Sequence, residues 1–223
     1  MPNNRLPAAV LFDLDGTLVD SEHYWMLSER KLAEEHNAEW NAQDGIDLIG
    51  MSLYDSSVII GRKLGSALAP DEIIDRLTAV VIEQLQVALP WRPGARELLL
   101  HLREAGVKTA LVTMSMRRMA LAVADAVGFD AFDVVIAGDD VANGKPHPEP
   151  YLLAAERLGV EPQHCVAFED SVPGLASAEA AGTKAVGVPN IVKLDEREGR
   201  TLWPTLEGIT LTDLMNLFEE ETR

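Results

Sequence analysis

A short apolar run near the N-terminus stops abruptly at two carboxylates. Ala8–Phe12 is continuous and apolar, and Asp13 and Asp15 follow it, with Gly16–Thr17 directly behind them. Such a run is typical of a strand in a parallel sheet that is covered on both faces. The carboxylates would then lie at the carboxyl end of the strand, where open α/β sheets bind ligands.

The spacing of these aspartates gives a first chemical indication. If the strand period holds through Asp15, the side chains of Asp13 and Asp15 point to one side of the strand and that of Leu14 to the other. Two like charges this close repel each other unless a cation or a shared proton relieves them. The pattern therefore indicates a metal site, and a helix cap or a turn is the structural alternative. This stretch alone leaves both open.

The segment 21–89 shows helical patterns and no convincing strand. Its apolar residues recur at roughly helical spacing with charges between them. Helices are expected at Ser21–His36, at about Leu53–Leu64 and from Pro70 to about Leu89, with a polar connection from Asn37 to Gly50. The segment therefore reads as an all-helical insertion.

From Pro90 onward, strand and helix patterns alternate. Strands are expected at Lys108–Val112, Phe132–Ala137, Cys165–Phe168, Lys184–Val188 and near Glu207–Leu211. Helices are expected at Pro93–Ala105, Met116–Val127, Glu149–Leu158, Val172–Ala181 and Thr212–Glu220, the last capped by Thr212, with a surface loop over Pro189–Pro204. This alternation predicts an α/β fold with a Rossmann-like parallel-sheet core. We expect a core domain of residues 1–20 and 90–223 and an inserted all-helical cap domain of residues 21–89.

Composition restricts the partners. The chain has 36 acidic and 19 basic residues among 223 and a net charge of −17, which argues against nucleic acid or an anionic membrane as a partner. The single cysteine, Cys165, fits a reducing compartment. No stretch approaches the ~20 apolar residues of a membrane span, and the first residues lack the apolar region of a signal peptide. We expect a cytoplasmic monomer.

Polar and charged residue types follow four of the expected strands. In chain order they are Asp13 and Asp15, then Thr113, Met114 and Ser115, then Lys145 in a loop, then Glu169 and Asp170. In a parallel sheet these strand ends share one edge, so residues far apart in the sequence can converge. This common placement is stronger evidence for a site than any single motif.

Each group also has a structural alternative. Thr113 and Ser115 could simply cap the next helix, although a helix start with free N–H groups is also a phosphate cradle. Lys145 could be a solvated surface charge. Glu169 and Asp170 could cap a helix, but two adjacent acids that end an apolar strand are costly without a cation, which favours metal binding.

Carboxylate ligands at strand ends select a hard cation, and Mg²⁺ fits best. A carboxylate beside Mg²⁺, with hydroxyls, a helix N-terminus and a lysine, suits phosphoryl transfer through an aspartyl phosphate. An anionic substrate in so acidic a chain needs such a local positive site.

Four segments resemble the haloacid dehalogenase-like hydrolases, in the subfamily with an α-helical cap that includes β-phosphoglucomutase and phosphatases. They are DLDGT at Asp13–Thr17, the strand end at Thr113 and Ser115, GKPHPEPY at Gly144–Tyr151 and FEDSVPG at Phe168–Gly174. All four occur in the family's order, and the resemblance covers nearly the whole chain.

The resemblance implies a role for each matching residue. Asp13 would attack phosphorus, and Asp15 would act first as general acid and then as general base. The phosphoryl group would be held by Thr113, Met114, Ser115 and Lys145. The metal would be held by Asp13, Asp15 through its backbone carbonyl, Asp170 and Glu169, the last either directly or one shell further out.

The cap would then close over the strand ends, exclude water and select the substrate. Its candidate substrate-facing residues are Glu22, Trp25, Leu53 and Tyr54. The mutase carries a histidine a few residues past the first motif and an arginine in a cap segment, and this chain has Trp25 and Leu53 near those positions. We therefore expect a Mg²⁺-dependent phosphatase of a small phosphorylated metabolite such as a sugar phosphate, with a phosphosugar mutase as the alternative.

Two interpretations from other classes use similar residues. A signalling receiver domain also combines acidic residues, Thr or Ser and Lys, but its acidic pair precedes its phosphoacceptor, and the order here looks reversed. A phosphate-binding protein without turnover is the other, and the intact Asp13 and Asp15 speak against it.

Overall fold

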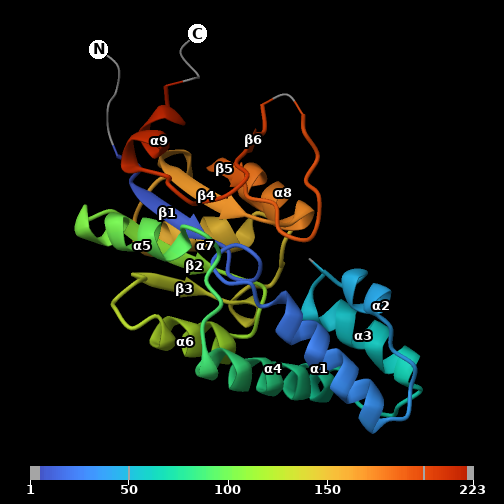
Figure 1. Cartoon of the computed structure of the whole chain (residues 1–223). Coiled ribbons are helices and arrows are strands. Elements are labelled where there is room, and N and C mark those ends of the chain that lie inside the picture. The colour runs from blue at the N-terminus through green and yellow to red at the C-terminus, as the bar shows by residue number, and fades with distance from the viewer. Residues whose placement is uncertain (1–5, 50, 198, 220–223) are drawn as a thin grey trace.

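One parallel sheet forms the centre of the molecule (Figure 1). The computed structural model describes residues 6–49, 51–197 and 199–219, so residues 1–5 and the expected segment ends Gly50 and Glu220 lie outside the described part. Within it, the sheet has the strand order β3-β2-β1-β4-β5-β6. The strands are β1 Ala9–Phe12, β2 Lys108–Val112, β3 Val134–Ile136, β4 Cys165–Glu169, β5 Lys184–Gly187 and β6 Thr201–Leu202.

The register of the central strands aligns their carboxyl ends. Phe12 of β1 pairs with Leu111 of β2 on one side and with Phe168 of β4 on the other. One residue further, the backbone N–H of Asp13 donates to the Phe168 carbonyl at 3.0 Å. Residues that follow β1, β2 and β4 are thereby brought to one edge of the sheet.

Helices cover both faces of the sheet. Side chains of alternate β1 residues enter two separate hydrophobic clusters, Val10 and Phe12 in one and Ala9 and Leu11 in the other. The first cluster includes side chains of α5 (Ala95–Glu104), α6 (Arg117–Ala126) and α9 (Leu211–Asn216), and the second includes those of α7 (Glu149–Leu158) and α8 (Val172–Ala180). The expected α/β fold with a Rossmann-like parallel-sheet core is confirmed.

Four helices from one stretch of the chain gather beside this core (Figure 1). They are α1 Glu22–Glu35, α2 Ala42–Ile46, α3 Leu53–Leu64 and α4 Pro70–Val87. Helix α4 packs against α1 and α3, and it also contacts α6 of the core. The assignment of residues 21–89 to a cap domain, and of 1–20 and 90–223 to a core domain, stays a proposal.

The two chain segments that join these helices to the core run side by side. Asp20 donates its backbone N–H to the Pro90 carbonyl at 2.7 Å, and Arg92 donates to the Leu18 carbonyl at 2.9 Å. An exposed ion pair, between Arg118 Nη2 and Asp75 Oδ1 at 2.9 Å, adds a contact between α6 and α4. No helix in the described part of the chain is both long and apolar enough to cross a membrane.

Three local expectations are wrong. The strand expected near Glu207–Leu211 is absent because Gly208 adopts a left-handed φ of 77° and Thr210 caps α9. The cap is therefore Thr210 and not Thr212, since the Thr210 side chain accepts the N–H of Asp213. The expected loop 189–204 contains the short strand β6, which adds to the sheet by pairing with β5.

The polar connection expected over residues 37–50 contains the five-residue helix α2. Asn41 and Asp44 form a reciprocal capping box at its start. Elsewhere the bounds of α3, β2 and α7 agree with the expected segments residue for residue.

Candidate active site

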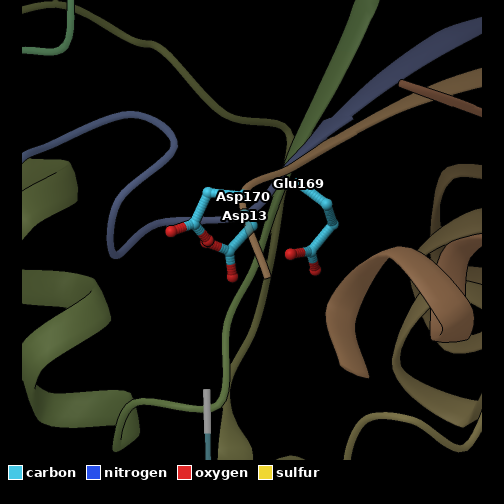
Figure 2. A group of neighbouring side chains, drawn as sticks. All are labelled: Asp13, Glu169 and Asp170. Carbon is cyan, nitrogen blue, oxygen red and sulfur yellow. The ribbon is translucent and has the colours of Figure 1, made fainter. Parts of the chain in front are cut away.

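Three buried carboxylates meet where β1 and β4 end. Asp13 follows β1, Glu169 is the last residue of β4, and Asp170 follows it. One carboxylate oxygen from each lies within 4.8 Å of the others. Figure 2 shows Asp13 and Asp170 side by side with Glu169 next to them.

Lys145 links two of these carboxylates. Its Nζ lies 2.6 Å from Asp13 Oδ1 and 2.6 Å from Glu169 Oε1, and it also donates to the Val112 carbonyl at 2.9 Å. The expected solvated alternative for Lys145 is thereby excluded, because its side chain is only 5% exposed. One lysine among three carboxylates leaves excess negative charge in a buried place.

Two of these three carboxyl groups, those of Asp13 and Asp170, have raised pKa values. Burial raises the pKa of Asp13 to about 7, against the lowering effect of Lys145. Burial, reinforced by Asp13 and Glu169, raises the pKa of Asp170 well above its usual range. A divalent cation would relieve both effects, and an all-oxygen donor set of this kind fits Mg²⁺.

Asp15 has a separate set of partners. Its carboxylate accepts hydrogen bonds from Ser21 Oγ at 2.5 Å, Trp25 Nε1 at 3.0 Å and Ser115 Oγ at 2.6 Å. These donors come from the start of the helical segment and from the end of β2. Asp15 is therefore fixed between the sheet edge and α1, away from the cluster of three carboxylates.

The turn after Asp15 requires glycine. Gly16 has a φ of 85°, in the left-handed region that favours glycine, and a Cβ there would overlap the carboxylate of Asp170. Strand β1 ends at Phe12, so the strand period does not reach Asp15. This explains why the carboxylates of Asp13 and Asp15 meet different partners.

The residues after β2 organise the neighbouring loop. Thr113 Oγ1 accepts the N–H of Ser115 at 2.9 Å, and both side chains are buried. The sulfur of Met114 accepts the N–H of Lys145 at 3.4 Å. Neither Thr113 nor Ser115 caps α6, because the N-cap position is Met116 and no side chain caps it.

Glu169 is enclosed more deeply than the other acids. It is fully buried, and its Oε1 accepts a hydrogen bond of 2.5 Å from the hydroxyl of Tyr151 on α7. Helix α8 is capped by Ser171, whose Oγ accepts the N–H of Gly174 at 3.1 Å. Neither Glu169 nor Asp170 serves as this cap, so the structural alternative for the pair does not hold.

A cavity of about 100 Å³ lies between the sheet edge and the helices α1–α4. Ten of the expected site residues line it, namely Asp13, Asp15, Glu22, Trp25, Leu53, Thr113, Met114, Ser115, Lys145 and Asp170. Glu169 lies behind Lys145 and does not line the cavity. Tyr54 is 58% exposed and also stands outside the lining, because consecutive residues of α3 point in different directions.

Several lining or supporting residues escaped the sequence reasoning. They are Ser21, Met26, Glu29, Ser56, Tyr151 and Ser171. For Glu29 a signal was present. Glu22, Trp25, Glu29 and Leu32 recur at intervals of three and four residues, which assigns both glutamates to the buried face of α1.

The family model for "haloacid dehalogenase-like hydrolase" matches residues 7–182. The chain therefore belongs to the haloacid dehalogenase-like hydrolases, and the resemblance and the enzyme class expected from the motifs are confirmed. Members of this family generally use a divalent metal, and the buried carboxylate cluster offers a place for one.

The named relatives include phosphatases. The chain is 32% identical over 179 residues to the phosphorylated carbohydrates phosphatase of Thermotoga maritima, covering 80% of this chain and 83% of that one. It is 31% identical over 191 residues to a bifunctional riboflavin kinase/FMN phosphatase of Arabidopsis thaliana, covering 85% of this chain but 50% of that protein. These relatives support phosphatase activity.

A crystal structure of CbbY from Rhodobacter sphaeroides in complex with phosphate shares the fold. It has a TM-score of 0.81 and 27% identity, and the match covers 91% of this chain and 96% of that one.

Proposed function

We propose that this chain is a Mg²⁺-dependent phosphatase that hydrolyses a small phosphate ester, a sugar phosphate, through an aspartyl phosphate on Asp13. The observation that carries the proposal is the position of Asp13. Asp13 lines the cavity, its Oδ1 lies 2.6 Å from the ammonium group of Lys145, and one of its carboxylate oxygens lies within 4.8 Å of one of Asp170. A nucleophile, a counter-charge and a cation site are thereby combined at one point.

In the first step a carboxylate oxygen of Asp13 attacks phosphorus, and the bond from phosphorus to the ester oxygen breaks. Asp15 donates a proton to that leaving oxygen. Thr113, Ser115 and Lys145, with backbone N–H groups of the loop that includes Met114, hold the phosphoryl oxygens.

In the second step a water oxygen attacks the phosphorus of the aspartyl phosphate. Asp15 now takes the proton of this water, the bond between phosphorus and the Asp13 oxygen breaks, and orthophosphate leaves. The hydrogen bonds from Ser21 and Trp25 hold the Asp15 carboxylate where it can serve both steps.

Asp13, Asp170 and the backbone carbonyl of Asp15 would hold Mg²⁺, with Glu169 as a ligand or one shell further out. When bound, the metal neutralises charge on the transferring phosphoryl group. Lys145 supplies a second positive charge at the same point, in a chain whose net charge is −17.

The cap residues favour hydrolysis over phosphosugar mutase chemistry. Leu53, which stands near the position of the mutase arginine, lines the cavity and offers no charge to a second phosphate. Glu22 and Trp25 are the other expected cap residues that line it. The similarity to a phosphatase of phosphorylated carbohydrates supports a sugar phosphate as substrate.

The test is the release of orthophosphate from a panel of sugar phosphates and from p-nitrophenyl phosphate, with Mg²⁺ present. We expect turnover that is lost in Asp13→Asn and in excess chelator, and that is kept in Asp125→Asn, an exposed control on α6. A stable phosphoprotein without turnover would instead support a receiver. Conversion of β-glucose 1-phosphate to the 6-phosphate faster than its hydrolysis would support the mutase.

A further inference from the structure

A second pair of carboxyl groups lines the cavity, and both belong to helix α1. Glu22 and Glu29 lie two turns apart on α1, and both line the cavity although the mechanism above uses neither. Their exposed fractions are only 9% and 6%. Because Glu22 stands nearer to Asp13 and Asp15, whose charges act on it, and Glu29 lies beyond it, the pair extends from the reacting end toward the cap.

The Glu29 carboxyl group is incompletely satisfied. Its Oε2 atom is buried and has no hydrogen-bond partner among the described residues. Burial raises the pKa of Glu29 to about 7, although hydrogen bonding to Trp40 lowers it. A buried polar atom without a partner is rare in a folded protein, and because Glu29 also lines the cavity, its unsatisfied carboxyl group points to a bound group there.

The neighbouring helix leaves room for this carboxyl group. Gly45 of α2 also lines the cavity, and a Cβ at this position would stand 2.9 Å from Glu29 Oε2. The side chain of Glu29 therefore takes up space that any larger residue at position 45 would remove. Gly45 has no left-handed φ that would demand glycine.

The described residues of α1–α4 that line the cavity include no positively charged side chain. Among the described lining residues Lys145 is the one cation, and it is engaged by Asp13 and Glu169 at the reacting end. The remaining cap wall is largely apolar and includes Leu48, Ile49 and Ile60. A second phosphate or a carboxylate placed here would meet two glutamates and no counter-charge.

We propose that Glu22 and Glu29 form the subsite for the leaving group, where they hydrogen-bond the hydroxyl groups of an uncharged, polyhydroxylated alcohol and reject a second anionic group. The inference rests on the proposed phosphatase function and names its substrate class: monophosphates of neutral sugars or polyols. Glu29 acts on specificity, and Asp13 and Asp15 carry the chemistry.

The experiment compares kcat/KM for three kinds of substrate. Fructose 6-phosphate has one phosphate and several free hydroxyl groups, fructose 1,6-bisphosphate carries a second phosphate, and p-nitrophenyl phosphate has no hydroxyl groups. We expect the wild type to prefer the monophosphate over the bisphosphate by about tenfold or more.

The variants isolate Glu29. In Glu29→Leu we expect the ratio of sugar phosphate to aryl phosphate kcat/KM to fall about tenfold, since a hydrogen bond to the sugar is lost, whereas Glu29→Gln keeps the ratio within about threefold. Gly45→Ala should lower the same ratio by displacing the carboxyl group. Glu34→Leu, on the same helix but 70% exposed, is the matched control and should leave the ratio unchanged.

The outcomes separate the two proposals. Suppose that p-nitrophenyl phosphate is hydrolysed and Asp13→Asn abolishes this activity, but the ratio of sugar phosphate to aryl phosphate kcat/KM is the same in wild type, Glu29→Leu and Gly45→Ala. The proposed subsite is then wrong, and the proposed phosphatase function is unaffected. A preference for the bisphosphate also overturns the subsite alone. If no phosphate ester is hydrolysed, both proposals fail. Thermal unfolding measures whether each variant is folded. If Glu29→Leu does not fold, Gly45→Ala alone tests the subsite.

Discussion

Asp15 receives hydrogen bonds from side chains that come from two distant parts of the chain. Ser21 and Trp25 belong to the start of the helical segment, and Ser115 follows β2. The orientation of this carboxylate therefore depends on how the cap helices meet the core. A proton donor and acceptor must be held in position in this way if it is to serve the two steps of hydrolysis.

Replacement of Asp15 by Asn should remove the proton transfers and leave the binding groups in place. We expect kcat for the best sugar phosphate to fall roughly 10²- to 10⁴-fold, the usual contribution of general acid–base catalysis. Steady-state kinetics with Mg²⁺ measures it, with Asp125→Asn as control. A kcat within about threefold of wild type would remove Asp15 from the mechanism.

Glu29 predicts a pH dependence of stability. Its pKa is raised from 4.5 to about 7 in the folded protein, so the unfolded chain loses this proton first as the pH rises. Below pH 4.5 Glu29 is protonated in both states and does not lower the free energy of unfolding. Between pH 4.5 and about 7 the free energy of unfolding falls as the pH rises, and above about pH 7 this loss is complete.

The measurement compares wild type with Glu29→Gln in urea unfolding. Between about pH 5 and pH 8 we expect wild type to lose about 2 kcal/mol more than the variant, because glutamine does not titrate. Subtracting the two curves cancels the titration of other groups. Parallel curves would show that Glu29 has no raised pKa. Glu34→Gln, which is exposed, should follow wild type.

At the scale of elements, the C-terminal helix α9 shows how an N-cap residue decides where a helix begins. The sequence pattern favoured a strand near Glu207–Leu211 and a cap at Thr212. In the structure Thr210 and Asp213 form a reciprocal capping box, and α9 begins at Leu211. Leu214 of this short helix is fully buried against the sheet, so the helix start matters to the core.

Thr210→Ala should therefore lower the free energy of unfolding by about 1 kcal/mol, the usual loss for an N-cap residue. Thr212→Ala is the matched control. Its side chain is exposed and should change the stability by less than about 0.5 kcal/mol. Chemical denaturation distinguishes the two, and equal effects would contradict the assignment of the cap.

At the scale of the whole molecule, negative charge is concentrated at the proposed phosphate site. The chain carries a net charge of −17, and three buried carboxylates meet at the sheet edge beside one lysine. The folded state without metal bears this repulsion, which the unfolded chain largely avoids. A cation that binds only the folded state should then stabilise the entire molecule.

Mg²⁺ should raise the free energy of unfolding by about 2.7 kcal/mol when its free concentration is about 100 times Kd. Thermal unfolding with and without chelator measures this shift. Asp170→Asn should abolish most of it by removing one carboxylate of the cluster. An equal Mg²⁺ shift in Asp170→Asn, or none in wild type, would contradict the assigned metal site.

Many helices and strands of the core could be predicted from local sequence patterns. Short segments that end in an apolar run, such as Lys108–Val112, and helical spacing such as that of Glu149–Leu158 predicted elements with the observed bounds. Errors fell on short elements. Helix α2 has five residues in a polar stretch, and the two-residue β6 exists because it pairs with the edge of β5, a contact that no local pattern encodes.

The candidate site likewise has features that the sequence predicts and features that it does not. The sequence by itself determined which residues lie at the strand ends, because a parallel sheet brings Asp13, Thr113 and Glu169 to one edge. Only the tertiary structure decided their partners: Asp15 turns toward Ser21 and Trp25, and Glu169 lies behind Lys145.

The wall of the cavity formed by α1 and α2 shows most clearly what could not be predicted from the sequence. The spacing of α1 is enough to place Glu29 on its buried face, although Glu29 was not singled out from the sequence, but whether a buried glutamate finds a partner depends on which residues another helix packs against it. In this molecule α2 brings Gly45, which leaves space and no hydrogen-bond donor to Oε2. Local sequence determines which side chains face inward, and long-range packing alone determines what they meet there.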